Sequence, residues 1–143
     1  MAHPERFNIP PNTQSLLIID DCLHSLTKSE VFASICRGKS HHENINVFLI
    51  IQDLSNTGTL LRQALRNVHY FIVTQNHADI LQYMGRKQFM YMNQYVQQCF
   101  DIAKERLSYP YILINNTPTC PKDRSITSGI LEGEEAILLA LSV

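Results

Sequence analysis

The sequence predicts an α/β fold, a mainly parallel sheet with flanking helices. Two observations support this prediction: short, almost wholly apolar runs recur along the chain, and stretches with helical apolar spacing separate them. Uninterrupted apolar runs are typical of strands buried on both faces of a parallel sheet. Strands that alternate with helices indicate right-handed crossovers between parallel strands. At 143 residues, with 45% hydrophobic residues, the chain is long enough for one domain with a substantial core.

The predicted strands are the runs richest in Leu, Ile, Val and Phe. They cover residues 16–20, 46–51, 70–73 and 111–114. Residues 135–141 fit either a last strand or a helix. Residues 1–14 are polar and contain several prolines, so we expect an N-terminal arm, followed by a single α/β domain over residues 15–143.

The predicted helices lie between these strands. Asp21 or Ser25 can cap a helix that runs to about Cys36, and the polar residues 37–44 then form a loop. Further helices are expected over residues 60–67, 77–87 and about 92–107.

Composition narrows the class of protein. No apolar run approaches the length of a transmembrane helix, and the first residues lack the apolar core of a signal peptide. We therefore expect a cytoplasmic or nuclear protein, including a virion-associated one, with free thiols and no membrane contact. The net charge of -1 gives no overall basic field, so DNA binding would need a local patch or a larger assembly.

The most informative motif is Asp20-Asp21, which directly follows the apolar run from Leu16 to Ile19. Carboxylates at the carboxyl end of a buried strand lie where open α/β sheets bind ligands. A Walker B segment has this form: its first acid holds Mg²⁺ through water, and its second polarises the water that attacks a nucleotide phosphate. A strand followed by a helix N-cap has the same pattern, so the motif alone leaves both interpretations open.

Several further motifs follow Asp20-Asp21 in a characteristic order. They are Gly38-Lys39-Ser40-His41-His42, Ile51-Gln52-Asp53, Arg62, Asn67-Val68-His69-Tyr70, Asn76-His77-Ala78-Asp79 and Tyr109-Pro110-Tyr111. From about residue 16 to 130, this order and spacing resemble the C-terminal half of the FtsK/HerA-type DNA-packaging ATPases. The nearest likeness is to those of Maverick/Polinton elements, adintoviruses and related large DNA viruses.

The resemblance implies a role for each matched residue. Asp20 would bind the cofactor as the Mg²⁺ ligand acting through water, and Asp21 would polarise the attacking water. Gln52 would be the sensor that orients this water, and Arg62 an arginine finger that serves a neighbouring subunit. Without the resemblance, a solvated Gln at a strand end is the favoured interpretation of Gln52, and an ordinary surface arginine on a helix explains Arg62 equally well.

The departures from the family pattern are as informative as the matches. No Gly-x-x-x-x-Gly-Lys-Ser/Thr motif occurs, and Gly38-Lys39-Ser40 follows a predicted helix instead of a strand, so it is not a P-loop. The family's first strand is also missing, Gln75 and Ala78 replace expected basic residues, and Asn115 replaces a common acid. The chain thus has the pattern of a truncated P-loop-NTPase-like fold.

Two hypotheses about function follow from this truncation. In the first, the chain is a packaging-ATPase-like subunit that is inactive alone and uses ATP and Mg²⁺ only if a partner supplies the P-loop. In the second, it is a non-catalytic protein-interaction module that kept the sheet. Both predict a homo-oligomer or a protein partner, because the lost strand leaves open sheet edges. DNA contact is expected only within a larger assembly.

A zinc site is a rival use of the cysteines and histidines near Asp20. The candidates are Cys22, His24, Cys36, His41 and His42, but their spacing fits no standard zinc module. Buried apolar roles for Cys22, Cys36 and Cys99 are therefore the preferred interpretation. The Tyr- and Met-rich segment 83–95 has only two basic residues, so it favours core or interface packing over nucleic-acid stacking.

Overall fold

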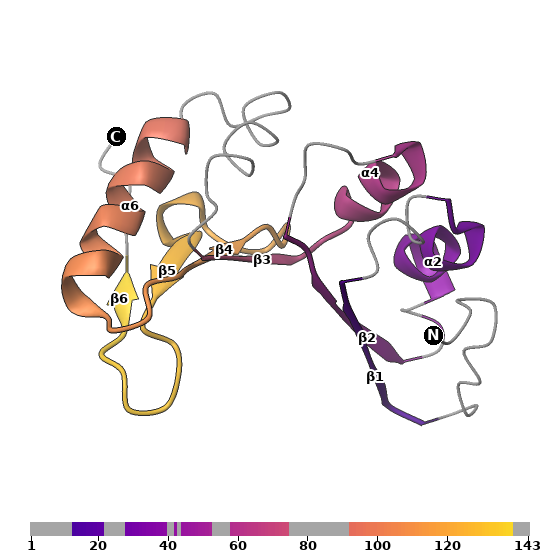
Figure 1. Ribbon diagram of the computed structural model, residues 1–143, viewed down its shortest axis with the longest axis horizontal. Helices are drawn as coiled ribbons and strands as arrows, with labels where there is room; N and C mark the ends of the chain where they lie inside the picture. The colour runs from indigo at the N-terminus through magenta and orange to yellow at the C-terminus, as the bar shows by residue number, and fades with distance from the viewer. Residues whose placement is uncertain are drawn as a thin grey trace. The chain divides into compact units, whose positions relative to one another are not determined.

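The computed structural model describes residues 13–21, 28–39, 42, 44–52, 58–74 and 92–138. The chain divides into two compact units, residues 1–68 and 69–143 (Figure 1). Helices and strands are mixed in both units, as the sequence predicts. The predicted helix over residues 77–87 and the motif Asn76-His77-Ala78-Asp79 lie outside the described residues.

The first unit contains a parallel pair of strands. Strand β1 (Ser15–Asp20) pairs with β2 (Ile45–Ile50), in a register that runs from Ser15 opposite Ile45 to Asp20 opposite Ile50. The strands and their parallel direction agree with the sequence prediction. The connection between them contains a helix, as a parallel pair requires.

The prediction that these strands are buried on both faces was wrong. Residues alternate along each strand: Ile19 and Ile45 are buried, whereas Leu16, Ile18, Phe48 and Ile50 are exposed. Side chains of a strand point alternately to the two faces, so the pair has one buried and one exposed apolar face. The apolar residues predicted the positions of the two strands correctly, but composition does not determine how many layers cover a sheet.

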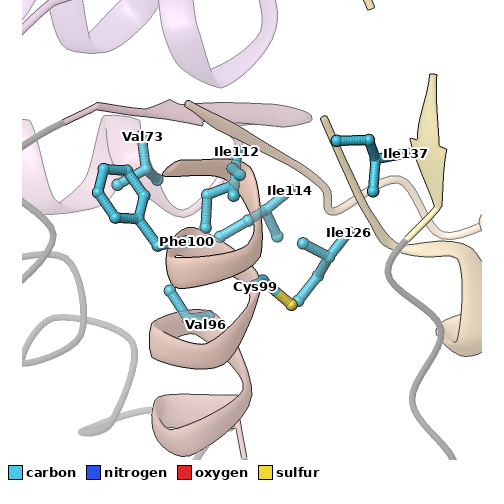
Figure 2. Close-up of a cluster of buried hydrophobic side chains, with 9 residues drawn as sticks. Val73, Val96, Cys99, Phe100, Ile112, Ile114, Ile126 and Ile137 are labelled. Carbon is cyan, nitrogen blue, oxygen red and sulfur yellow. The ribbon is translucent and has the colours of Figure 1, made fainter. Parts of the chain in front are cut away.

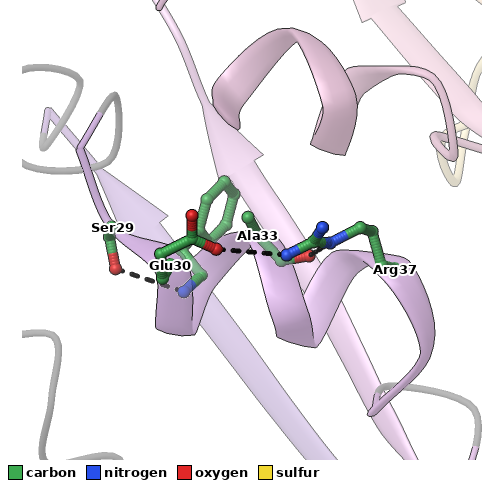
Figure 3. Close-up of polar contacts among 5 residues, drawn as sticks. Ser29, Glu30, Ala33 and Arg37 are labelled. Atoms are coloured by element: carbon green, nitrogen blue, oxygen red, sulfur yellow. Dashed lines mark hydrogen bonds and ion pairs between the residues drawn. The ribbon is translucent and has the colours of Figure 1, made fainter. Parts of the chain in front are cut away.

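In the described part of the connection between β1 and β2, two short helical segments follow one another. Helix α2 (Glu30–Ser34) begins at the N-cap Ser29, whose Oγ accepts a hydrogen bond from the Phe32 N–H at 3.2 Å. The chain continues directly into a π-helix, η2 (Ile35–Lys39). Arg37 donates through Nε to the Ala33 carbonyl and pairs through Nη2 with Glu30, both at 3.2 Å (Figure 3).

These segments correct two sequence predictions. Ser29 caps this helix, because its side chain meets an otherwise unsatisfied backbone N–H; Ser25 lies outside the described residues. Residues 37–39 are helical and not part of a loop, and the contacts of Arg37 with the preceding turn support the extension.

Helix α4 (Thr59–Leu65) agrees closely with the predicted helix over residues 60–67. It contacts α2, and the Asn67 side chain just beyond it donates a hydrogen bond to the Cys36 carbonyl at 3.3 Å. The buried side chains of this helical layer are Phe32, Ala33, Ile35, Leu61, Ala64 and Leu65. The core of the first unit therefore lies on the helical side of the strand pair.

The second unit contains an antiparallel sheet of four strands, in the order β3-β4-β5-β6. They are β3 (Tyr70–Val73), β4 (Ile112–Asn115), β5 (Ile126–Ser128) and β6 (Ile137–Leu138). The positions of β3 and β4 confirm the predicted strands, but the prediction that they belong to a mainly parallel sheet was wrong. Hydrophobic patterns locate strands and carry no information on their direction.

Short connections explain the antiparallel order of β4, β5 and β6. Residues 116–125, which include the 3₁₀ turn η3 (Lys122–Arg124), join β4 to β5, and residues 129–136 join β5 to β6. Connections of this length allow only antiparallel neighbours when they carry no crossover helix. Sequence reasoning missed β5, which has a single large apolar residue, and left β6 open between strand and helix.

Helix α6 (Met92–Arg106) covers one face of this sheet and matches the predicted helix over residues 92–107. Its Val96, Cys99, Phe100 and Ala103 pack with side chains from all four strands (Figure 2). The strand residues in this cluster are Val73, Ile112, Ile114, Ile126 and Ile137. The prediction that Cys99 is a core residue is confirmed.

Candidate functional site

The adjacent carboxylates Asp20 and Asp21 lie at the carboxyl end of β1. Asp20 is the last residue of the strand, and Asp21 follows with a φ of 50°, in the left-handed region. Asp tolerates this conformation better than most residues, and it ends the strand sharply. Both residues are exposed. The chain therefore presents two carboxylates to solvent at one corner of the parallel pair.

Gln52 lies at the same edge of the sheet. Because β1 and β2 are parallel and Asp20 is opposite Ile50, the chain reaches Gln52 two residues beyond the level of Asp20. Gln52 is exposed. The carboxyl ends of neighbouring parallel strands are the usual ligand edge of an open α/β sheet. The structure thus brings Asp20, Asp21 and Gln52 to one edge.

Arg62 lies on a different element, in the middle of α4. Its side chain is exposed, whereas the neighbouring Leu61 and the nearby Ala64 are buried. Arg62 therefore belongs to the solvent face of α4, whereas Asp20, Asp21 and Gln52 lie at the ends of β1 and β2. Such a position suits either a residue that acts on another subunit or an ordinary surface arginine.

The donor set at this edge determines which ligand it can hold. Among the described residues, no group of three or more His, Cys, Asp or Glu side chains is placed to bind a metal ion. Two carboxylates from Asp20 and Asp21 are too few for a complete metal cage. They do suit Mg²⁺, which is commonly held by one or two carboxylates together with waters and the phosphates of a nucleotide. Asp20 and Asp21 could therefore hold a Mg²⁺ ion only together with ligands that another molecule supplies.

The described cysteines do not support a thiolate metal site. Burial raises the pKa of the Cys36 thiol to about 11, and burial likewise raises the pKa of Cys99. Metal binding requires the thiolate, which these surroundings disfavour. Cys120 is a third free cysteine, in the loop between β4 and β5. Cys22, His24 and His41 lie outside the described residues, and His42 is exposed.

Other motif residues have structural roles in the second unit or at its border. Asn115 accepts hydrogen bonds from the Thr117 N–H at 3.0 Å and the Thr117 hydroxyl at 2.7 Å. The His69 carbonyl accepts a hydrogen bond from the Asn116 N–H at 2.7 Å. These contacts fix the turn after β4 and give no sign of ligand chemistry.

A polar cluster around Tyr111 was not anticipated from the sequence. The Tyr111 hydroxyl donates to Glu134 Oε2 at 2.6 Å and accepts from the backbone N–H groups of Ile130 at 2.7 Å and Leu131 at 3.2 Å. The Ser128 hydroxyl donates to the Tyr111 carbonyl. The cluster ties the β5–β6 connection to the start of β4, so its role is structural.

A depression of about 240 Å³ lies beside this connection. Arg106, Tyr109, Glu134 and Glu135 contribute to its lining. Its volume is below the range of about 300–1,000 Å³ that is usual for small-molecule pockets, and its lining is polar and charged. The depression therefore does not compete with the strand edge as a ligand site.

Comparisons with known proteins add no relative. No protein-family model matches the chain, and no match was found among curated proteins or among solved structures. Within the part of the chain that the structure describes, no helix is long and apolar enough to cross a membrane.

Proposed function

We propose that the chain is a packaging-ATPase-like subunit that contributes half of a nucleotide site and needs a P-loop from a partner. The observation that supports this proposal is the grouping of Asp20, Asp21 and Gln52 at the carboxyl edge of a parallel strand pair. Carboxylates and an amide at this edge are the groups expected beside a Mg²⁺-bound nucleotide. The motif order in the sequence supports the same assignment.

Each residue has a distinct task in this proposal. Bound Mg²⁺ would neutralise phosphate charge, and Asp20 would hold it through a water molecule. Asp21 would accept a hydrogen bond from the attacking water and polarise it, and Gln52 would hold that water in line. Arg62, exposed on α4, would stabilise transition-state charge on a nucleotide held by a neighbouring subunit.

The missing P-loop predicts that the isolated chain does not hydrolyse ATP. Groups that stabilise a transition state act only when the phosphates are held beside them, and the P-loop backbone and lysine do that work. ATPase activity of the purified chain should therefore equal the buffer background. Turnover above background that disappears in Asp21→Asn would contradict the proposal.

The positive test is a mixed assembly with a P-loop protein, for which a reading frame beside the gene is the first candidate. Asp21→Asn should abolish Mg²⁺-dependent turnover of the assembly. Arg62→Ala should lower kcat by about 10³-fold or more and leave nucleotide affinity nearly unchanged, because a finger acts on the transition state. Asp123→Asn, an exposed acid in the second unit, is the matched control and should have no effect.

Two outcomes would remove parts of the proposal. Equal turnover of wild type and Asp21→Asn in an active assembly would remove the strand edge from the site. Equal turnover of wild type and Arg62→Ala would remove only Arg62.

A non-catalytic interaction module is the second candidate, and a specific observation favours it. Four large apolar side chains on one face of the β1–β2 pair are 42–64% exposed. Exposed apolar patches that a monomer does not need commonly mark protein interfaces. An isolated chain that binds a protein tightly, with no dependence on Mg²⁺-nucleotide or on Asp20 and Asp21, would favour this candidate.

A further inference from the structure

The outer face of the β1–β2 pair, defined by Leu16, Ile18, Phe48 and Ile50, is the largest unexplained feature of the first unit. These side chains are exposed by 64%, 60%, 48% and 42%, respectively. The register places Ile18 opposite Phe48, so the apolar side chains form adjoining rows. Asp20 and Asn46, both exposed, lie on the same face at its opposite ends.

Parallel strands rarely leave such a face in water. Purely parallel sheets occur almost only where both faces are covered, and two strands alone are at best marginally stable. The antiparallel sheet of the second unit also exposes Ile72 and Leu138, but antiparallel sheets commonly keep one solvated face. The outer face of the parallel pair is therefore the surface that most needs a cover.

The area of the outer face fits a second copy of the chain. A fully exposed aromatic side chain contributes about 200 Å² and Leu or Ile somewhat less, so the four exposed fractions give at most roughly 400 Å² of apolar surface. A standard interface buries about 800 Å² per partner, of which somewhat more than half, or about 450 Å², is apolar. The outer face alone thus supplies nearly the apolar part of such an interface.

Charge is compatible with self-association and selects the orientation. The chain has a net charge of -1, so two copies repel each other only weakly. The apolar rows carry no charge, and Asp20 lies at one end of the face. If the strands of the two copies ran parallel, both Asp20 carboxylates would meet at the same end and repel. With antiparallel strands, the carboxylates lie at opposite ends of the interface.

We propose that the chain forms a two-fold symmetric dimer in which the outer faces of two copies stack with their strands antiparallel. Ile18 and Phe48 then lie near the two-fold axis, each over its counterpart. Each Asp20 lies over Leu16 of the other copy, about 13 Å along the strand from the second Asp20 at about 3.3 Å per residue. This inference does not rest on the proposed nucleotide site.

The dimer leaves the second edge of β2 open to a partner strand. Among the described strands, β2 pairs only with β1, so its second edge lies in the plane of the sheet and away from the stacked face. A strand added at that edge and a copy stacked on the outer face use different directions of approach. The two assemblies can therefore be tested separately.

The first test is sedimentation of the purified full chain at micromolar concentration. Wild type should form a dimer. Phe48→Asp should raise the dissociation constant of the dimer at least about tenfold, because a charge would be buried without a partner. Ile72→Asp is the matched control: Ile72 is 47% exposed, like Phe48 at 48%, but lies in the second unit. This variant should dimerise as wild type does. Far-UV circular dichroism of both variants verifies that they are folded.

The second test determines the orientation with a short bis-maleimide crosslinker. Ile18→Cys should give a crosslinked dimer joined through position 18, located by mass spectrometry against the wild-type background of native cysteines. Asp20→Cys should not crosslink through position 20, because its two copies are too far apart. Crosslinking through position 20 but not 18 would overturn the antiparallel arrangement.

A strictly monomeric wild type would overturn the proposal. It would mean that another protein, or another segment of the same chain, covers the outer face. A dimer that Phe48→Asp leaves intact would overturn it as well, since the interface would then lie elsewhere.

Discussion

Gly129 is the position where a single methyl group should do most damage to the second unit. It follows β5 with a φ of +64°, and an added Cβ would overlap the Glu135 carbonyl oxygen and lie 2.8 Å from its carbonyl carbon. Both are backbone atoms, so no side-chain rotation can relieve the overlap. Gly129→Ala must therefore displace the connection between β5 and β6.

The cost follows from what this displacement breaks. A left-handed alanine costs about 1–2 kcal/mol by itself. Moving the connection also disrupts the hydrogen bonds from the Ile130 and Leu131 N–H groups to the Tyr111 hydroxyl, each of which contributes about 1 kcal/mol. It also disrupts the pairing of β5 with β6. The expected loss is about 3–5 kcal/mol, a large part of the 5–15 kcal/mol that is typical of a domain.

Gly133 provides the matched control in the same connection. Its φ is +86°, but an added Cβ would meet nothing within 4 Å. Gly133→Ala should therefore cost only the backbone term of about 1–2 kcal/mol. Urea unfolding followed by circular dichroism measures both losses, and hydrogen exchange of β4 and β5 assigns them to the second unit. Equal losses for the two variants would refute the overlap argument.

Two further predictions concern Tyr111 and the half-buried Cys36, whose surroundings raise the pKa of each side chain. Tyr111→Phe should destabilise the second unit by about 1–3 kcal/mol, because the Ile130 and Leu131 N–H groups lose their acceptor. Burial and the bond to Glu134 raise the pKa of Tyr111, so wild type should lose stability as the pH rises above 10, and Tyr111→Phe should lack this loss; identical profiles would contradict the assignment. Burial raises the pKa of Cys36 from 9.0 to about 11, so at pH 8 alkylation of Cys36 should be roughly 100-fold slower in the folded than in the urea-unfolded chain, as peptide mass spectrometry can measure. Similar alkylation rates in the folded and the unfolded chain would show that the Cys36 thiol is accessible and that its pKa is not raised.

The sequence located most of the described regular elements. Strands β1, β2, β3 and β4 and helices α4 and α6 lie within one or two residues of their predicted positions. Apolar periodicity is a local property, so it is readable without tertiary contacts. The short strand β5 escaped because Ile126 is its only large apolar residue, and pairing with β4 is what makes it a strand.

The sequence also placed the candidate site at one edge. Asp20 ends one predicted strand and Gln52 directly follows the next, and a parallel pairing is sufficient to bring the two strand ends together. Arg62 could be assigned only to a helix, because its position relative to the strand ends depends on packing. The roles of these residues in ATP chemistry remain predictions that the mixed-assembly experiment tests.

By itself, the sequence determined which segments are helical or extended and which faces are apolar, since these follow from side-chain size, polarity and spacing. Only the tertiary structure decided strand direction and the number of covering layers. The chain around β4, β5 and β6 is antiparallel because its connections are short, a constraint that no single strand carries. The outer face of β1 and β2 is exposed because no other layer among the described residues packs against it. The sequence does not reveal this, since Leu16 and Ile18 are the same residues whether the face is covered or exposed.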